Sequence, residues 1–254
     1  MICIIDYGVG NLFSLKSSLA HLGLEAKVSA DAADIRATDR LILPGVGAFG
    51  DTMAKLEATG LVPVIREEAA KKPLLGICLG MQLLFEKSYE YGEHDGLGFV
   101  PGQVCPLAPD LGDKSLKVPQ IGWNAVHILR DDPLFTYVRD GEYFYYVHSY
   151  YGKNCAANTL AVSDYSLPVT GVVKAGKVYG TQFHPEKSGD AGLRLLKAFS
   201  EREITAQSRI RSTAPLPRGA SGEEAKLHEM PKPLLLGEVA APKVQTERLY
   251  EGKP

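Results

Sequence analysis

Residues 76–80 read Gly-Ile-Cys-Leu-Gly and place Cys78 between two glycines, each two residues away. This spacing is that of a nucleophile elbow, in which the nucleophile occupies a sharp turn between a strand and a helix. An apolar run from residue 74 ends at Cys78, and a helical pattern follows. A helix N-terminus favours the thiolate form of a cysteine, and the N–H of Leu79 is placed to donate to an oxyanion. A buried core cysteine is the alternative for this pattern taken alone, and the context favours a nucleophile.

A nucleophilic cysteine needs a base, and the base needs a group that orients it. Of the six histidines, His184 is the best candidate, because it ends the apolar segment 178–183. In a parallel sheet, catalytic groups gather outside the carboxyl ends of the strands, and Cys78 and His184 both follow such ends. Glu186 can accept a hydrogen bond from the imidazole and fix its tautomer. We therefore predict a Cys78–His184–Glu186 triad.

Two other motif interpretations fail on context. Residues 45–50 read Gly-Val-Gly-Ala-Phe-Gly and satisfy the dinucleotide-binding pattern, but they do not form the first turn between a strand and a helix. We interpret this loop as a second set of backbone N–H donors that faces the Cys78 site and completes an oxyanion hole. The His-Pro-Glu sequence at 184–186 matches part of a zinc deaminase motif, but no cysteine follows Cys155.

The elements that must position these groups alternate between strand and helix up to residue 100. Such alternation predicts an α/β fold with three layers: a mainly parallel central sheet with helices on both faces, plus antiparallel additions. The expected strands and helices of this half are 1–6 (strand), 12–22 (helix), 26–28 and 40–43 (strands), 51–72 (helix, broken near Gly60 and Pro63), 74–77 (strand) and 79–85 (helix). The second half predicts strands at 103–107, 125–129, 143–149, 160–163, 171–175 and 177–183, a hairpin turn at 175–177 and a helix at 190–199.

The composition is that of an ordinary soluble protein. The chain has 254 residues, 45% of them hydrophobic and 23% charged, and a net charge of -2, which argues against a broad surface for nucleic acid or anionic lipid. Four cysteines are too few for a disulfide scaffold, and no apolar run approaches the roughly 20 residues of a membrane helix. We expect a cytoplasmic protein.

The composition changes near residue 200. Residues 201–254 hold six of the 16 prolines and contain no Cys, Trp or Phe. Such a segment buries too little apolar surface to offset its chain entropy. We therefore expect a working domain at 1–200 and a proline-rich tail at 201–254, disordered or loosely packed.

The motif set resembles the class I glutamine amidotransferases. Two segments carry the signatures of that family: Gly-Ile-Cys-Leu-Gly-Met-Gln at 76–82 and His-Pro-Glu-Lys-Ser at 184–188. More narrowly, the chain is similar to the glutaminase subunit of imidazole glycerol phosphate synthase over about residues 1–200. The segments that carry this likeness are Asp-Tyr-Gly-Val-Gly-Asn-Leu at 6–12, Pro-Gly-Val-Gly-Ala-Phe at 44–49, Pro-Gln-Ile-Gly-Trp-Asn at 119–124 and Val-His-Ser-Tyr-Tyr at 147–151.

The resemblance implies a glutaminase reaction. The Cys78 thiolate attacks the carboxamide of glutamine, His184 transfers protons and Glu186 orients His184. The oxyanion is held by the N–H of Leu79 and by the loop at Val46 and Gly47. The resemblance implies that this loop can need to reorient before it binds the oxyanion. The positions that match glutamine-binding residues of the family are Gln82, Glu90, Ser149 and Tyr150. No metal and no organic cofactor is implied.

The resemblance also implies a partner, because free ammonia would be protonated and lost in bulk water. That partner is a cyclase subunit with a (β/α)₈ barrel, joined to this chain in a heterodimer. It converts the nucleotide-like intermediate PRFAR to imidazole glycerol phosphate and AICAR in histidine biosynthesis. Asn11, Trp123 and Lys187 match family positions near that interface.

Three alternatives stay open at this point. The first is a glutaminase of the same superfamily that supplies a different synthase. The second is a stand-alone cysteine hydrolase or peptidase with the same elbow, active without a partner and indifferent to glutamine. The third is a catalytically silent binding subunit, which the complete set of Cys78, His184 and Glu186 argues against.

Overall fold

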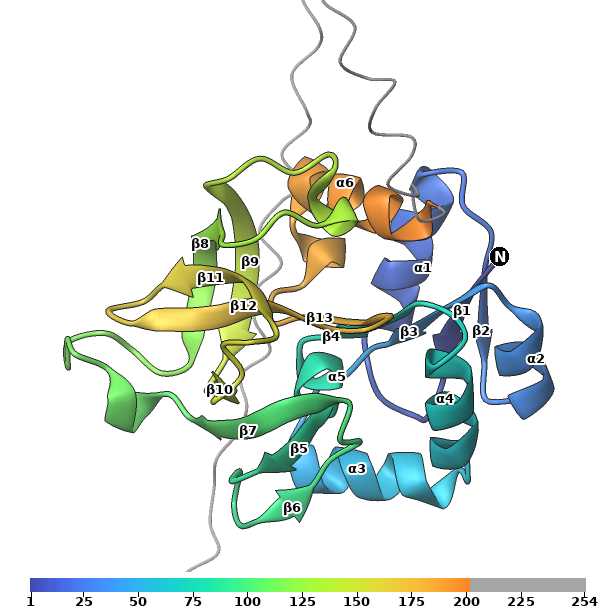
Figure 1. Ribbon diagram of the computed structural model, residues 1–254, viewed down its shortest axis with the longest axis horizontal. Coiled ribbons are helices and arrows are strands. Elements are labelled where there is room, and N and C mark those ends of the chain that lie inside the picture. The colour runs from blue at the N-terminus through green and yellow to red at the C-terminus, as the bar shows by residue number, and fades with distance from the viewer. Residues whose placement is uncertain (202–254) are drawn as a thin grey trace, which may run out of the picture. The chain divides into compact units, whose positions relative to one another are not determined.

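Four short strands with apolar residues on both faces form the centre of the main sheet. β1 (Ile2–Ile5), β3 (Arg40–Leu43), β4 (Leu74–Ile77) and β13 (Val178–Thr181) are buried at every residue. In the computed structural model, which describes residues 1–201, these strands and the edge strand β2 (Ala26–Ser29) run parallel (Figure 1). Strands buried on both faces are typical of a parallel sheet covered by helices on each side.

Four antiparallel strands extend the same sheet. They are β12 (Pro168–Ala175), β11 (Thr159–Asp164), β8 (Gln120–Ile128) and β9 (Glu142–His148). The complete order is β2-β1-β3-β4-β13-β12-β11-β8-β9. The change of direction occurs at the tight turn between β12 and β13, where Ala175 pairs with Val178. The predicted α/β class, the predicted hairpin turn and the predicted antiparallel additions are confirmed.

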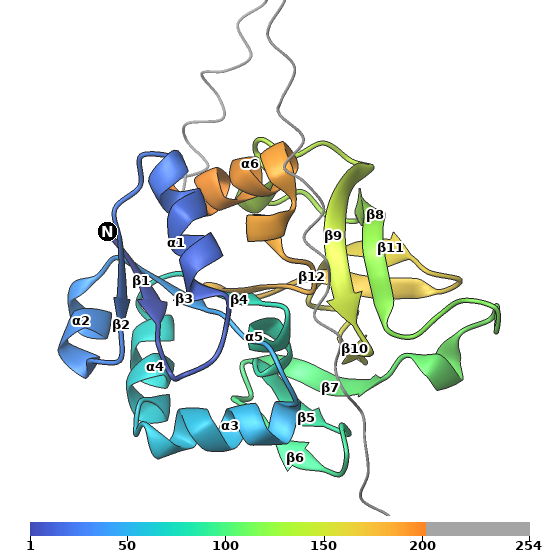
Figure 2. The same ribbon diagram turned by 180° about the vertical axis from the view of Figure 1, so that it is seen from behind.

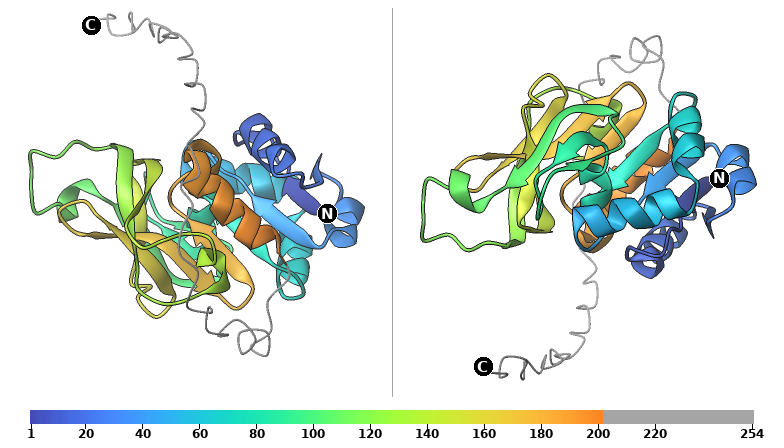
Figure 3. Two further views of the ribbon diagram at one scale, coloured as in Figure 1. Left: turned by 90° about the horizontal axis from the view of Figure 1, so that it is seen from above. Right: turned by 90° about the horizontal axis from the view of Figure 1, so that it is seen from below.

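Helices cover both faces of the parallel half. α1 (Leu12–His21) and α6 (Gly189–Ser200) lie over one face. The other face is covered by α2 (Ala32–Ala37), α3 (Phe49–Ala58) and α4 (Val62–Ala69) (Figures 1 and 2). Viewed from above, α1 and α6 cross the parallel half, and the antiparallel half extends to one side (Figure 3). The predicted break in the helical segment 51–72 is confirmed by the separation of α3 from α4.

Two hydrophobic clusters, one on each face, hold the layers together. On one face, Leu15 and Leu19 of α1 and Leu195 of α6 are almost fully buried. On the other face, Ile35 of α2 and Leu56 of α3 are buried as completely. Each such side chain contributes about 1.5–3 kcal/mol relative to an exposed position, so the helix layers fix the sheet on which the site is built.

A second, four-stranded sheet packs beside the first and has the order β10-β7-β5-β6. Its strands are β10 (Tyr150–Lys153), β7 (Val100–Pro106), β5 (Phe85–Ser88) and β6 (His94–Asp95). Three short 3₁₀ helices complete the described elements: η1 (Ala108–Asp110), η2 (Pro133–Phe135) and η3 (Pro185–Lys187). Of this sheet, only β7 was predicted from the sequence.

The helix predicted at 79–85 is much shorter in the structure. α5 (Leu79–Gln82) is a single turn, and Phe85 already pairs with Val100 in the second sheet. The run from Leu83 to Phe85 is buried throughout, and a short apolar run does not distinguish a buried helix from a buried strand. α2 was not predicted at all, although Asp31 caps it by accepting a hydrogen bond from Ala33 N over 2.7 Å.

Within residues 1–201, no helix is both long enough and apolar enough to cross a lipid bilayer. The predicted tail at 201–254 lies, except for its first residue, outside the described residues, so this prediction and the boundary at residue 200 stay predictions.

Candidate active site

Cys78 forms a strained turn between β4 and α5. Its backbone has φ +55° and ψ −112°, a conformation that residues other than glycine rarely adopt. The turn is held on both sides, because Cys78 N donates to Thr181 O over 2.7 Å and Gln82 N donates to Cys78 O over 3.1 Å. A strained residue held in this way is what a nucleophile elbow requires.

Three glycines let the turns after β3 and β4 touch backbone to backbone. A Cβ on Gly80 would lie 1.9 Å from Leu43 O, and a Cβ on Gly45 would lie 2.4 Å from Gly80 N. A Cβ on Gly76 would lie 2.5 Å from Gly80 O. No side chain fits at these positions, so the close approach brings the loop that contains Gly45 against the start of α5.

His184 and Glu186 are both buried and form a direct pair. His184 Nδ1 lies 2.8 Å from Glu186 Oε1, and the ring donates to the carboxylate. Burial by itself lowers the pKa of His184, but the interactions with the Cys78 sulfur and the Glu186 carboxylate outweigh it and raise the pKa to about 9. The imidazole is therefore held as a cation beside the Cys78 sulfur.

The backbone around His184 is tied to strand β9. His184 N donates to Tyr145 O over 3.0 Å, and Tyr145 N donates to Ser188 Oγ over 3.0 Å. The same Ser188 hydroxyl donates to His184 O over 2.6 Å. The catalytic segment and β9 therefore hold each other in place.

A pocket of about 490 Å³ opens beside Cys78 and His184. Many of the predicted site residues line it together: Val46, Gly47, Cys78, Leu79, Gln82, Glu90, Ser149, Tyr150, His184 and Lys187. Glu186 lies behind His184, beside a much smaller void that Asn11 also lines. The structure thus brings together the residues predicted for catalysis, for the oxyanion and for glutamine. Their individual roles stay predictions.

The loop after β3 lies at the mouth of this pocket. Gly47 has φ +106°, a conformation that favours glycine, and Val46 is partly exposed. The carbonyl of Pro44 accepts a hydrogen bond from the buried Tyr7 hydroxyl, which fixes the first residue of the loop. The loop is anchored at Pro44 and lines the pocket together with Cys78, and its predicted role in holding an oxyanion stays a prediction.

A chain of buried amides connects Gln82 to the nucleophile. Gln82 Nε2 donates to Tyr150 O over 2.9 Å and to Gln182 Oε1 over 3.1 Å. Gln182 is fully buried, and its Nε2 lies 3.9 Å from Cys78 Sγ. Sequence reasoning missed Gln182, although an amide between buried strand residues and His184 was an available signal.

His148 is a second residue to which the sequence analysis gave no catalytic role, because it preferred His184 among the six histidines. It is buried in the pocket wall, and its Nδ1 donates to Tyr150 O over 2.9 Å. Burial lowers the pKa of His148 to about 4, so the ring is neutral near pH 7. Its Nε2 accepts no hydrogen bond within the described residues. A neutral acceptor beside His184 is therefore part of the site.

The three residues predicted at a partner interface lie in different settings. Trp123 is 52% exposed and contacts Tyr145 edge to face, with ring centroids 6.1 Å apart. Lys187 Nζ lies 5.9 Å from the centroid of the same Tyr145 ring. Asn11 caps α1, accepting from Ser14 N over 3.3 Å. Trp123 and Lys187 thus share one surface, whereas Asn11 has a structural role in its helix.

The donor set of the site is that of thiol and acid–base chemistry. Within residues 1–201, no group of three or more His, Cys, Asp or Glu side chains is placed to hold a metal ion. All four cysteines fall in this part of the chain and carry free thiols.

Comparison with known sequences gives strong matches over the described residues. Residues 3–201 match the family model described as glutamine amidotransferase class-I. The imidazole glycerol phosphate synthase subunit HisH of Listeria monocytogenes is 47% identical over 209 residues, which are 82% of this chain and 99% of that protein. The subunit of the same name from Lacticaseibacillus casei is 50% identical over 202 residues, or 79% of this chain and 95% of that one.

Solved structures agree on the fold at much lower identity. A crystal structure of a glutamine amidotransferase superposes with a TM-score of 0.61 and 21% identity, covering 78% of this chain and 99% of that chain. The PurLQS structure from Thermotoga maritima gives a TM-score of 0.60 at 19% identity, covering 78% and 96%. The family model and the two HisH relatives, together with the motifs around Cys78 and His184, lead to one assignment. The chain belongs to the class I glutamine amidotransferases and, within them, to the HisH subunits of imidazole glycerol phosphate synthase.

Proposed function

We propose that this chain hydrolyses glutamine to glutamate and ammonia through a thioester on Cys78. The observation that carries the proposal is the buried, cationic His184, paired with Glu186 at 2.8 Å and placed beside a strained cysteine. An imidazolium beside a cysteine favours the thiolate nucleophile and provides a proton donor for the leaving group.

The reaction begins when the Cys78 thiolate adds to the carboxamide carbon of glutamine. The carbonyl oxygen becomes an oxyanion, which the N–H of Leu79 and the loop at Val46 and Gly47 stabilise. His184 gives its proton to the nitrogen, the C–N bond breaks and ammonia leaves, with a thioester on Cys78. Water, deprotonated by His184, then hydrolyses the thioester to glutamate and restores the thiolate. Each oxyanion donor is worth about 10²–10³ in rate.

The pocket also offers groups for the other end of glutamine. The Glu90 carboxylate lines it and suits the α-ammonium group, while Ser149 and Tyr150 line the wall beside His148. Gln82 is fixed by Tyr150 O and Gln182, so its side chain is preorganised before substrate arrives. These contacts favour an amino acid amide over a peptide, and therefore favour a glutaminase over a peptidase.

We also propose that the ammonia passes to a cyclase subunit with a (β/α)₈ barrel, docked on β8 and β9. Ile121, Trp123 and Tyr143 lie on the same face of this strand pair and are more than half exposed. An exposed aromatic patch of this kind is typical of a protein–protein interface. The partner would use the ammonia to convert PRFAR to imidazole glycerol phosphate and AICAR. The cytoplasmic location stays a prediction.

The decisive experiment measures glutamate release from glutamine with and without the cyclase subunit and its ligand. We expect Cys78→Ala to abolish release, whereas Cys105→Ala, a thiol of the second sheet outside the pocket, retains it. Full activity of Cys78→Ala would overturn the mechanism. Equal activity toward simple amides or esters without a partner would support the stand-alone hydrolase instead.

The docking surface is tested by a binding titration with the cyclase subunit. Trp123→Ala is expected to weaken binding at least about fivefold, because truncating a central aromatic residue commonly costs 1 kcal/mol or more. Leu129→Ala, an exposed apolar residue past the end of β8, serves as the matched control and is expected to bind normally. Unchanged binding of Trp123→Ala would place the interface elsewhere.

A further inference from the structure

Helix α3 starts two residues after Gly47, and its own sequence supplies no cap. The N-cap residue is Ala48, which makes no side-chain hydrogen bond to the helix. The N–H of Phe49, the first residue of α3, instead donates to Glu90 Oε2 over 2.7 Å. A carboxylate at a helix N-terminus satisfies an orphan donor and interacts favourably with the helix dipole. Glu90, 41 residues away in the sequence, thus replaces the missing cap.

The segment that carries Glu90 contacts the same turn of α3 at a second point. A Cβ on Gly50 would lie 2.6 Å from Cε1 of His94, so the His94 ring packs directly on the helix backbone. The backbone that carries Glu90 is itself fixed, because Glu90 N donates to Ser88 Oγ over 3.2 Å. The segment 88–94 therefore holds the start of α3, and with it the end of the loop that contains Val46 and Gly47.

The same carboxylate faces the substrate pocket. Glu90 lines the pocket together with Gly47 and Cys78. Burial raises the pKa of the Glu90 carboxyl, and the hydrogen bond from Phe49 N–H opposes this only in part. The carboxylate therefore lacks a full counter-charge, which the α-ammonium group of a bound glutamine would provide.

We propose that Glu90 is a positioning residue for the oxyanion loop: its carboxylate connects the ammonium of bound glutamine to Phe49 N–H and so places residues 46–48 for the reaction. The inference rests on the proposed glutaminase function and deepens it. One carboxylate serves both the recognition of the substrate amino group and the placement of the loop.

A substrate without an amino group separates these two roles. Glutaric acid monoamide is glutamine without its α-amino group, so Glu90 has no charge to recognise on it. Glu90→Ala removes the acceptor for Phe49 N–H, whereas Glu90→Gln keeps an oxygen in its place. Hydrolysis of both substrates is measured for the wild type and both variants, in the complex with the cyclase subunit and its ligand.

If Glu90 positions the loop, Glu90→Ala lowers kcat/KM for the monoamide at least tenfold, while Glu90→Gln stays within about threefold of the wild type. With glutamine, Glu90→Gln raises KM more than it lowers kcat. The inference would be overturned if Glu90→Ala had the same kcat/KM on the monoamide as the wild type. Equal losses in the two variants would overturn it as well.

Two controls protect this outcome. Glu93→Ala, an exposed glutamate of the same segment that pairs with Lys87, is expected to behave as the wild type. The rate at which iodoacetamide alkylates Cys78 reports an intact elbow, and it is expected to be unchanged in both Glu90 variants.

If Glu90→Ala does not fold, His94→Ala decides the question. It removes the second contact on α3 and is expected to lower kcat/KM on both substrates by a similar factor of about three. No loss on either substrate would overturn the inference. A wild-type complex that releases no glutamate from glutamine would instead overturn the proposed function itself.

Discussion

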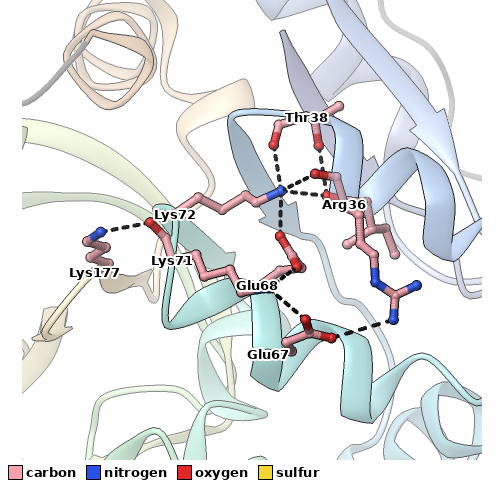
Figure 4. Close-up of polar contacts among 8 residues, drawn as sticks. Arg36, Thr38, Glu67, Glu68, Lys71, Lys72 and Lys177 are labelled. Atoms are coloured by element: carbon pink, nitrogen blue, oxygen red, sulfur yellow. Dashed lines mark hydrogen bonds and ion pairs between the residues drawn. The ribbon is translucent and has the colours of Figure 1, made fainter.

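The two ends of the parallel strands differ in how completely their buried polar side chains are hydrogen-bonded. At the amino ends of β3, β4 and β13, Glu68 is buried and both of its oxygens are paired, with Lys71 at 2.9 Å and Lys72 at 2.8 Å (Figure 4). Lys72 Nζ also donates to three carbonyls at the end of α2, those of residues 35, 36 and 38. Lys177, which precedes β13, donates to Lys71 O over 2.7 Å.

At the carboxyl ends, buried polar atoms are left without partners. Three buried side-chain atoms of the described residues have no hydrogen-bond partner: Glu186 Oε2, His148 Nε2 and Gln120 Oε1. Glu186 is in the triad, His148 lines the pocket, and Gln120 pairs with His148 across β8 and β9. Cys78 adds backbone strain at the same edge.

The contrast shows where this fold gains stability and where it gives stability up. A buried polar group without a partner costs about 1–3 kcal/mol, and a residue in a rare backbone conformation costs a similar amount. The amino edge avoids both costs. The carboxyl edge accepts both. For His148 the reason is its place in the pocket wall, because a group that must receive a substrate cannot already be satisfied by the protein.

The largest effect is expected at the strained edge. Cys78→Gly removes the thiol and also relieves the positive φ, so glutaminase activity is expected to fall at least 10⁴-fold while stability rises by about 1 kcal/mol. Cys78→Ala loses the same activity but keeps the strain, and it is the matched control. Denaturant unfolding of the two variants checks the difference, and equal stabilities would contradict the strain at Cys78.

At the amino edge, Lys72→Met is expected to destabilise the protein by about 3–5 kcal/mol, because it leaves the buried Glu68 carboxylate short of its main partner. Chemical unfolding measures the loss. Lys71→Met, whose side chain is more than half exposed, is expected to cost less than 1 kcal/mol. Below the unfolding transition, glutaminase activity of both variants should stay within twofold. A large fall in kcat for Lys72→Met would contradict the inference that the amino edge contributes to stability and not to catalysis.

The interactions of His184 with Cys78 and Glu186 predict a pH dependence of stability. The pKa of His184 is raised to about 9 from an ordinary value of 6.5, so the stabilisation is complete below pH 6.5 and is lost as pH rises through 9. The stability difference between the wild type and His184→Gln is therefore expected to shrink by about 3 kcal/mol from pH 6 to pH 10. Unfolding curves over this range test it, and a constant difference would contradict a cationic His184.

A smaller effect is expected at Gln182. Gln182→Met keeps the side-chain volume but removes the amide between Gln82 and Cys78, and we expect kcat/KM for glutamine to fall about tenfold. Stability should change by less than about 1 kcal/mol, because Gln82 keeps its bond to Tyr150 O. Steady-state kinetics with denaturant unfolding separates the two readouts. An unchanged kcat/KM would show that the amide chain has no part in the reaction.

The smallest effect is expected from the proline-rich segment. Deletion of residues 206–254 is expected to leave partnered glutaminase activity within twofold, because the motifs of the reaction end at Ser188. The assay is the one used for the full chain. A large loss would show that this segment supports the site or the interface.

The sequence predicted those parts of the fold and site that are local in the chain. Cys78 lies in a five-residue motif, and Glu186 is two residues from His184, so the spacing and the apolar strands that end beside these residues carried the prediction. The buried strands of the parallel half were predicted because an apolar run bounded by turn residues is a local signal. Their meeting at one edge follows from the rule for parallel sheets.

The rest depends on contacts between distant segments. Gln182 acquires its role only because Gln82 of α5, 100 residues away in the sequence, donates a hydrogen bond to it. Glu90 caps α3 through a contact that no local pattern announces. The helix expected at 79–85 ended after one turn because Phe85 finds a partner strand in Val100–Pro106. Tertiary pairing overrode the local preference at each of these places.

The bonds around Tyr145 also have a consequence for self-association. β9 is the last strand of the nine-stranded sheet, and a free edge strand is a template for pairing with another chain. Here the outward N–H of Tyr145 is taken by Ser188 and its carbonyl by His184. The catalytic segment thereby occupies backbone groups at which a second chain could pair, and this opposes edge-to-edge aggregation. Strands β8 and β9 can then expose aromatic residues on one face while a second copy of the chain is hindered from pairing along the edge of β9.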